Sequence, residues 1–104
     1  MSADGASTHP RLQLDECLSL PVRLSIVAAL ARVDDAEFGA VRDAIEVSDP
    51  VLSKQIRILE DTGYVSVRKG YVGKRPRTWL SLTEEGSAAL RRHLAALHEL
   101  IADL

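Results

Sequence analysis

Apolar side chains between residues 47 and 65 recur with the period of an α-helix. Leu52, Ile56 and Leu59 are spaced four and three residues apart, so on a helix they form one narrow stripe that faces a core. The opposite side of this helix carries Lys54 and Arg57. The pattern therefore predicts an amphipathic helix whose outward face is short, polar and partly cationic.

Both ends of this predicted helix carry sequence signals. Ser48 or Asp49 can serve as the N-cap, because a short side-chain oxygen accepts a hydrogen bond from a free N–H of the first turn. Pro50 suits that turn, since its φ is already helical and its missing N–H is not needed there. Gly63 can adopt the left-handed conformation that follows many helices. We therefore expect a helix of about three and a half turns, followed directly by a strand that starts near Tyr64.

A broad apolar stripe predicts another helix upstream, with Pro21 in its first turn. A stripe of this width is expected of a helix that is contacted from two sides. Its inward positions are Leu20, Leu24, Val27 or Ala28, and Ala31, widened by Ile26, Leu30 and Val33.

A turn at residues 34–35 and a short strand at residues 36–38 precede a second helix, which is expected over about residues 39–46. The gap between this helix and the one described first is short, which fits the tight turn of a helix-turn-helix. The residues expected to face the core here are Phe38, Val41 and Ile45.

The apolar period changes to that of a β-strand between residues 64 and 82. Apolar residues occupy alternate positions at Val65 and Val67 and again at Leu80 and Leu82, so two strands each offer one apolar face. The segment between them contains glycine and proline, which interrupt regular structure, and it is rich in Lys and Arg. We therefore expect a β-hairpin with a basic tip, that is, a wing.

Thr83 is expected to cap a last helix, because its hydroxyl oxygen can accept from a free N–H of the first turn. The two glutamates that follow support this start, since negative charge is favourable at the positive end of the helix dipole. Apolar residues then recur in this helix at the spacing of a coiled-coil seam. We expect a second subunit to cover the seam, and the leucines of a short helix or arm at residues 11–19 to pack on the C-terminal helix of the same or a partner subunit. The predicted interface residues are Leu12, Leu14, Leu90, Leu94, Leu97, Ile101 and Leu104.

Three of these segments resemble winged helix-turn-helix regulators of the MarR and ArsR type. The run S-D-P-V-L-S-K-Q-I-R-I-L-E-D-T-G-Y-V resembles their recognition helix and the following strand, and G-K-R-P-R-T-W-L-S-L-T-E-E-G resembles their wing and the start of the closing helix. With P-V-R-L-S-I-V-A-A-L upstream, the similarity covers roughly residues 20 to 95. It implies a mainly α fold with a small β-hairpin (α+β), in which a three-helix core is followed by a wing and a C-terminal dimerisation helix.

Length and composition fit one small domain. The chain has 104 residues and 46% apolar content, enough to build one core. It contains no run of 18 apolar residues, and its first ten residues have neither the basic nor the apolar region of a secretion signal. We therefore expect a cytoplasmic protein with a disordered tail at residues 1–10, a DNA-binding domain at residues 11–82 and a dimerisation helix at residues 83–104.

The net charge of −2 conceals a strongly cationic segment. Residues 54–77 hold seven basic and two acidic side chains, which leaves the remainder of the chain at −7. A surface with one cationic side can bind phosphate despite a negative total. The alternative interpretation is a solvated loop that happens to be basic.

The candidate DNA contacts lie on the recognition helix and the wing. Lys and Arg can donate to guanine, Ser53 can reach a base edge or a phosphate, and the Gln55 amide could read adenine. Asp49 is interpreted as a cap, with acceptance from cytosine N4 as the alternative. The candidates are Asp49, Pro50, Ser53, Lys54, Gln55 and Arg57 on the helix, and Lys69, Lys74, Arg75 and Arg77 on the wing.

Catalysis and metal binding find little support in the sequence. It contains no Gly-rich phosphate loop and no G-x-S-x-G motif. His93 and His98 are five residues apart, so they do not share a helical face as metal ligands would. Cys17 is interpreted as a small buried residue, with a redox-sensing thiol as the alternative. We expect neither an enzyme nor a cofactor.

The sequence thus predicts a homodimeric regulator of transcription that acts as a repressor and whose partner is double-stranded DNA. A module of the same fold that docks onto protein in a transcription or repair assembly is the alternative. A small-molecule inducer of unknown identity is a further candidate partner. No membrane partner is expected.

Overall fold

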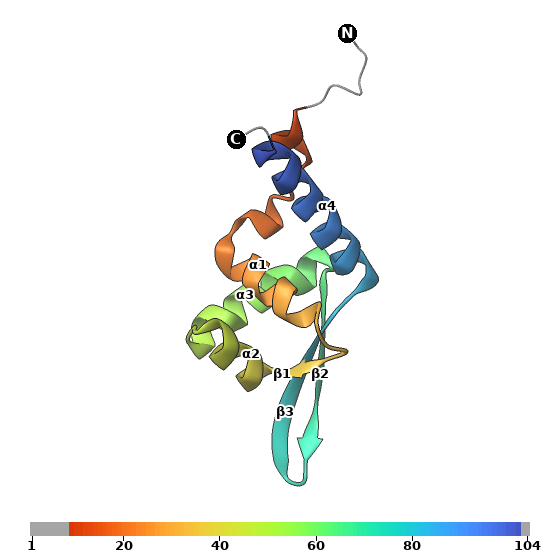
Figure 1. Ribbon diagram of the computed structural model, residues 1–104. Coiled ribbons are helices and arrows are strands. Elements are labelled where there is room, and N and C mark those ends of the chain that lie inside the picture. Colours follow the sequence, from red (N-terminus) through yellow and green to blue (C-terminus); the bar gives the residue numbers. More distant parts are fainter. Residues whose placement is uncertain (1–8, 103–104) are drawn as a thin grey trace.

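The computed structural model describes residues 9–102, and Figure 1 shows their arrangement. A helical body carries a long β-hairpin at one end, and the last helix extends from the other end. The elements in chain order are η2 (Pro10–Gln13), η3 (Cys17–Ser19), α1 (Pro21–Leu30), β1 (Ala36–Glu37), α2 (Phe38–Ile45), α3 (Asp49–Thr62), β2 (Val65–Val72), β3 (Arg75–Leu82) and α4 (Glu84–Ile101).

The strands form one antiparallel sheet in the order β1-β3-β2. This arrangement confirms the predicted winged helix-turn-helix, with β1 as the short strand expected before the second helix. His9 caps η2 and Pro10 begins it, so the region predicted as a disordered tail overlaps an ordered turn by two residues. The other predicted tail residues include residues 1–8, which lie outside the described part of the chain.

The core lies where the three central helices meet the sheet. Its buried residues come from η3, the four α-helices, β2 and β3: Leu18, Ile26, Val27, Leu30, Val41, Leu52, Ile56, Leu59, Val65, Leu80, Ala89 and Leu90. Of the alternatives Val27 and Ala28 in the stripe predicted for α1, Val27 is the buried one. The stripe was partly wrong, since Leu20, Ala31 and Val33 are exposed. The helix ends at Leu30, so the helical spacing does not extend to the last two of these residues.

Helix α3 begins and ends as its sequence predicts. The Ser48 hydroxyl accepts a hydrogen bond from the Val51 N–H at 3.4 Å, which identifies Ser48 rather than Asp49 as the N-cap. Gly63 follows the helix with a φ of 89°, in the left-handed region. The turn between α2 and α3 also contains a left-handed residue, Glu46. Its backbone N–H bonds to the carbonyl of Asp43, which closes the C-terminal end of α2.

The hairpin of β2 and β3 turns at Gly73 and Lys74, and Val72 pairs with Arg75. Gly73 has a φ of 63°, which glycine adopts without the steric penalty of a side chain. Farther down the hairpin, the Trp79 ring lies over the backbone of Gly70, where an added Cβ would be 3.2 Å from the ring. The hairpin is therefore an ordered extension of the sheet.

Helix α4 is anchored to the junction between α3 and β2. The Thr83 side chain caps α4 by accepting from the Gly86 N–H, and its hydroxyl donates to the Gly63 carbonyl at 2.7 Å. Gly86 lies so close to the Tyr64 carbonyl that a side chain would overlap it. At its other end α4 contacts η2 (Figure 1). This contact agrees with the prediction that the N-terminal segment packs on the C-terminal helix. Among residues 9–102, no helix combines the length and apolarity needed to cross a membrane.

Candidate nucleic-acid interface

The outward face of α3 is as polar as the sequence predicted. Pro50, Ser53, Lys54 and Arg57 are all exposed, while the stripe on the other side of the helix is buried in the core. Because the buried stripe fixes the rotation of the helix, these four side chains have a fixed direction relative to the body. Val51 is also exposed on this helix, which the helical pattern alone did not single out.

Asp49 takes part in an ion-pair cluster at the start of α3. Its carboxylate accepts from Arg42 of α2 at 2.9 Å, and the same guanidinium bonds to Asp43 at 2.9 Å. These hydrogen bonds raise the pKa of Arg42 above its ordinary value and lower the pKa of Asp43. Asp49 is therefore not the cap, and one oxygen of its carboxylate is bonded to Arg42. The sequence pattern did not single out Arg42, because its partner Asp49 lies across the turn between α2 and α3.

Gln55 faces the body of the protein rather than the outward face of α3. It is half-buried, and its side-chain carbonyl accepts from Arg23 of α1 at 2.9 Å. The same guanidinium donates to the Cys17 carbonyl at 2.6 Å. Gln55 thus links α3 to α1 and the N-terminal segment. Cys17 itself is half-buried, with its Sγ 3.9 Å from the Thr62 hydroxyl oxygen.

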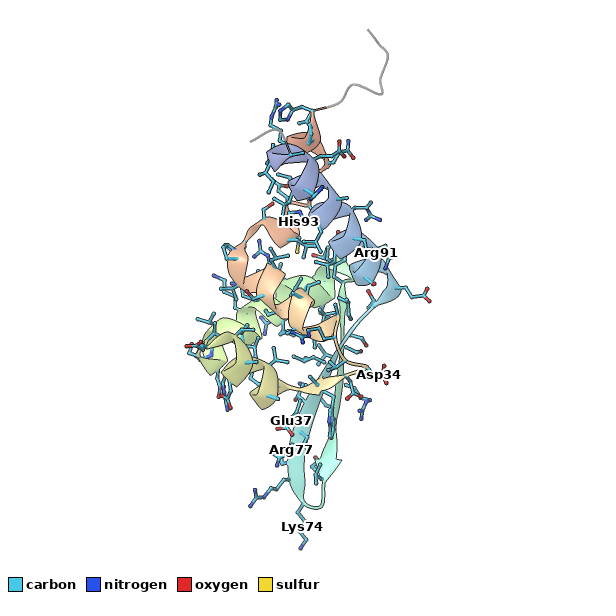
Figure 2. The ribbon with its side chains drawn as sticks, in the orientation of Figure 1. Asp34, Glu37, Lys74, Arg77, Arg91 and His93 are labelled. Carbon is cyan, nitrogen blue, oxygen red and sulfur yellow. The ribbon has the colours of Figure 1, made fainter. Side chains whose placement is uncertain are left out.

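The wing cations divide between the two faces of the hairpin. Lys69 pairs with Thr78 and faces α3, which settles the orientation that strand alternation alone left open. Arg75 and Arg77 lie on the opposite face, and Lys74 is in the turn at the end of the hairpin (Figure 2). The Nε of Arg77 is 3.5 Å from a carboxylate oxygen of Glu37, which offsets part of its charge.

An open groove of about 390 Å³ lies between α3 and the inner face of the hairpin. Its polar lining combines two cations with two hydroxyl groups: Ser53, Arg57, Lys69 and Thr78. Arg, Lys and short hydroxyl side chains are the groups that proteins use to bind the phosphates of DNA. The groove also contains one carboxylate, from Glu60. Thr78 was not predicted, since its place in the groove depends on the strand register.

Arg68 lies on the outer face of the hairpin, away from this groove. Its guanidinium carbon is 4.5 Å from the centre of the Trp79 ring, and one nitrogen is 3.7 Å from an Asp35 oxygen. Both contacts hold the charge against the side of the sheet that faces away from α3.

The predicted dimer seam on α4 is only partly exposed. Leu90 was placed wrongly, because it is 8% exposed and packs in the core of its own chain. Leu94 is 49% exposed, Ile101 is exposed and Leu97 is half-buried. Leu104 lies outside the described residues. In the N-terminal segment, Leu12 is exposed and Leu14 is half-buried.

Beside this seam, an apolar cleft of about 410 Å³ is lined by the N-terminal segment, α1 and α4. Leu14, Leu24 and Leu97 line it, together with His93, which is 2% exposed. The Nδ1 of His93 accepts from the Asp15 N–H at 2.9 Å, so the ring proton resides on Nε2. None of the described residues forms a hydrogen bond with Nε2.

Asp15 also joins this region to the end of α3. Its Oδ2 accepts from the Tyr64 hydroxyl at 2.5 Å, and its Oδ1 accepts from the Leu18 N–H. The hydrogen bond to the carboxylate, helped by burial, raises the pKa of Tyr64 to about 12. Within residues 9–102, no group of three or more His, Cys, Asp or Glu side chains is arranged to hold a metal ion.

A helix-turn-helix followed by a hairpin that extends the surface of its second helix defines the class of winged helix proteins. The family model described as "Winged helix DNA-binding domain" matches residues 22–101. The chain belongs to this family.

Solved structures agree with this assignment. A transcriptional regulator homologue from Pyrococcus horikoshii is similar with a TM-score of 0.81 and 29% identity, over 89% of this chain and 92% of that one. The transcriptional repressor BigR from Xylella fastidiosa is similar with a TM-score of 0.67 and 28% identity, over 88% and 85%. A zinc-responsive MarR family member, Lactococcus lactis ZitR, shares the fold with a TM-score of 0.60 and 19% identity, over 94% and 69%.

These similarities confirm the predicted winged helix-turn-helix fold, which the MarR family member shares. The similar proteins are described as regulators of transcription, in agreement with the expectation that the chain is not an enzyme.

Proposed function

We propose that this protein is a homodimeric regulator of transcription that binds double-stranded DNA through α3 and the wing. The observation that carries the proposal is the groove between them, where Arg57 and Lys69 converge from two elements beside the Ser53 and Thr78 hydroxyls. The backbone of one DNA strand would lie against Lys69, on the wing side of this groove. The exposed face of α3 would then enter the adjacent major groove.

The two parts of this surface have different tasks in the proposal. Ser53, Lys54 and Arg57 are on a helix whose other face is packed, so their positions are defined well enough to discriminate bases. Lys69 and the turn residue Lys74 would bind the backbone. Gln55 has a positioning role, because its bond to Arg23 holds α3 against α1.

The dimer would form through the exposed part of α4. Leu94, Leu97 and Ile101 recur at heptad spacing, and Leu12 is exposed on η2, which contacts α4. A two-fold dimer would present two α3 helices to successive major grooves, about 10 base pairs apart. Bound across a promoter, such a dimer would exclude polymerase, so we propose repression as its effect. The similar BigR protein is described as a repressor.

A small molecule could control this dimer through the cleft beside His93. The cleft has apolar walls, and the His93 Nε2–H offers one buried donor. A ligand with an apolar body and one hydrogen-bond acceptor would match both features. It would bind between the N-terminal segment and α4, next to the leucines proposed to form the interface. The cytoplasmic location expected from the sequence is part of the same proposal.

Selection of bound sequences from random duplex DNA tests the proposal most directly. We expect a two-fold symmetric site whose half-sites are about one helical turn apart. Arg57→Ala should then lower affinity for the selected site by about 1–3 kcal/mol and affect scrambled duplex less. Equal losses on both duplexes would mean that α3 binds only phosphate.

The alternative, a module that docks onto protein, makes a different prediction. DNA binding through this cationic surface must weaken steeply as the salt concentration rises. Failure to shift any duplex at low salt would remove the DNA-binding proposal and leave the docking module.

A further inference from the structure

The end of the wing carries large apolar side chains that the proposed phosphate contacts do not explain. Tyr71 is 73% exposed and Val72 is 55% exposed, next to the turn at Gly73 and Lys74. Figure 2 shows the hairpin projecting away from the helical body, with Lys74 at its end. No other described element covers this tip. A tip that served only to bind phosphate would gain nothing from an exposed aromatic ring.

The strand register places these two side chains on opposite faces. Tyr71 pairs with Pro76 and lies on the same face as Lys69 and Thr78, which line the groove against α3. Val72 pairs with Arg75 and lies on the outer face, with Arg68 and Trp79. Tyr71 therefore continues the proposed DNA-binding surface outward from the groove, whereas Val72 does not.

The reach of the hairpin gives Tyr71 a defined place on a duplex. Two residues of a strand span about 7 Å, so Tyr71 lies about that far beyond Lys69. If a phosphate chain lies against Lys69, a side chain at this distance reaches across the chain to the minor groove, which is about 6 Å wide. Two cations flank Tyr71 along the hairpin, Lys69 on the same face and Lys74 in the turn, and they complement the charge of the strands that border the groove.

We propose that Tyr71, with Pro76 opposite it, enters the minor groove and makes the protein prefer A·T over G·C base pairs under the wing. This inference rests on the proposed DNA-binding function. The two rings can pack on the apolar faces of the deoxyriboses, and the Tyr71 hydroxyl can donate to the N3 and O2 acceptors on the groove floor. The N2 amino group of guanine projects from that floor and would obstruct the ring.

The test compares Tyr71→Ser with Val72→Ser, which removes an exposed apolar side chain from the other face of the same tip. Each protein is titrated by fluorescence anisotropy with three duplexes that share the selected half-sites and differ only under the wing. These positions carry A·T, G·C or I·C pairs. Inosine lacks the 2-amino group of guanine but keeps its major-groove edge, so I·C isolates the minor groove.

We expect the wild-type protein and Val72→Ser to bind A·T and I·C duplexes at least about fivefold more tightly than G·C, the lower end of what one base contact supplies. Tyr71→Ser should lose this preference, and Tyr71→Phe should keep the sugar contact but lose part of the preference. An unchanged preference in Tyr71→Ser, or an equal loss in Val72→Ser, would overturn the inference. Absence of salt-dependent binding by the wild-type protein would instead overturn the proposed function itself.

Discussion

Replacement of Lys69 by glutamine tests whether the groove beside α3 holds the DNA backbone. Lys69 lines this groove with Arg57, whereas Arg68, its neighbour in sequence, lies on the outer face of the hairpin over Trp79. The two residues carry the same charge and differ mainly in the face they occupy, so Arg68→Gln is a matched control. Lys69→Gln should weaken binding to selected and scrambled duplexes by the same factor, because phosphate contacts carry no direct sequence information.

The size of the effect follows from counterion release. Each phosphate contact contributes about 0.9 to the slope of log affinity against log salt concentration. A dimer that loses Lys69 from both subunits should therefore lose about 1.8 from this slope. Between about 50 and 200 mM salt, the deficit of the variant relative to the wild type should shrink by about tenfold.

The slopes can be measured by anisotropy titrations at several salt concentrations, with thermal melting to show that both variants are folded. Arg68→Gln should leave the slope close to that of the wild type. An unchanged slope for Lys69→Gln, or the same loss for both variants, would refute the assignment of the groove to the phosphate chain.

Three further predictions concern assembly and stability. Leu94→Asp should produce folded monomers in sedimentation, whereas a monomeric wild-type protein at micromolar concentration would contradict the proposed dimer. Gly86→Ala should lower the free energy of unfolding by about 1–3 kcal/mol in urea titrations, because its Cβ would overlap the Tyr64 carbonyl, while Ser87→Ala should change it little. Tyr64→Phe should cost about 1 kcal/mol through the lost hydrogen bond to Asp15. Since the Tyr64 pKa of about 12 lies above its ordinary value of 10.0, that contribution is present below about pH 10 and should disappear as the pH rises through 12.

The features that the sequence predicted correctly are those that local interactions determine. The bounds of α3 follow from the Ser48 cap, Pro50 and Gly63, each of which acts within one turn of the helix. The hairpin follows from strand alternation and from glycine at the turn. The outward direction of Lys54 and Arg57 follows from the buried stripe on the other side of the helix.

The errors concern residues whose partners are distant in the chain. Gln55 lies on the flank of α3, and only the approach of Arg23 from α1 shows that its amide faces the body. Leu90 fits the heptad spacing, but periodicity does not distinguish the core of one chain from an interface between two. Asp49 could be assigned only after the turn between α2 and α3 had placed Arg42 beside it.

The same distant contacts connect the proposed dimer surface to the proposed DNA-binding surface. Asp15 bonds to His93 on α4 and to Tyr64, two residues beyond the end of α3. Thr83 bonds to Gly63 at that same end, so α4 is held to α3 at two points. If two copies associate through α4, these bonds determine the distance between the two α3 helices. A ligand that separated the N-terminal segment from His93 would loosen one of the two connections, and the spacing of the half-sites would then no longer match the dimer.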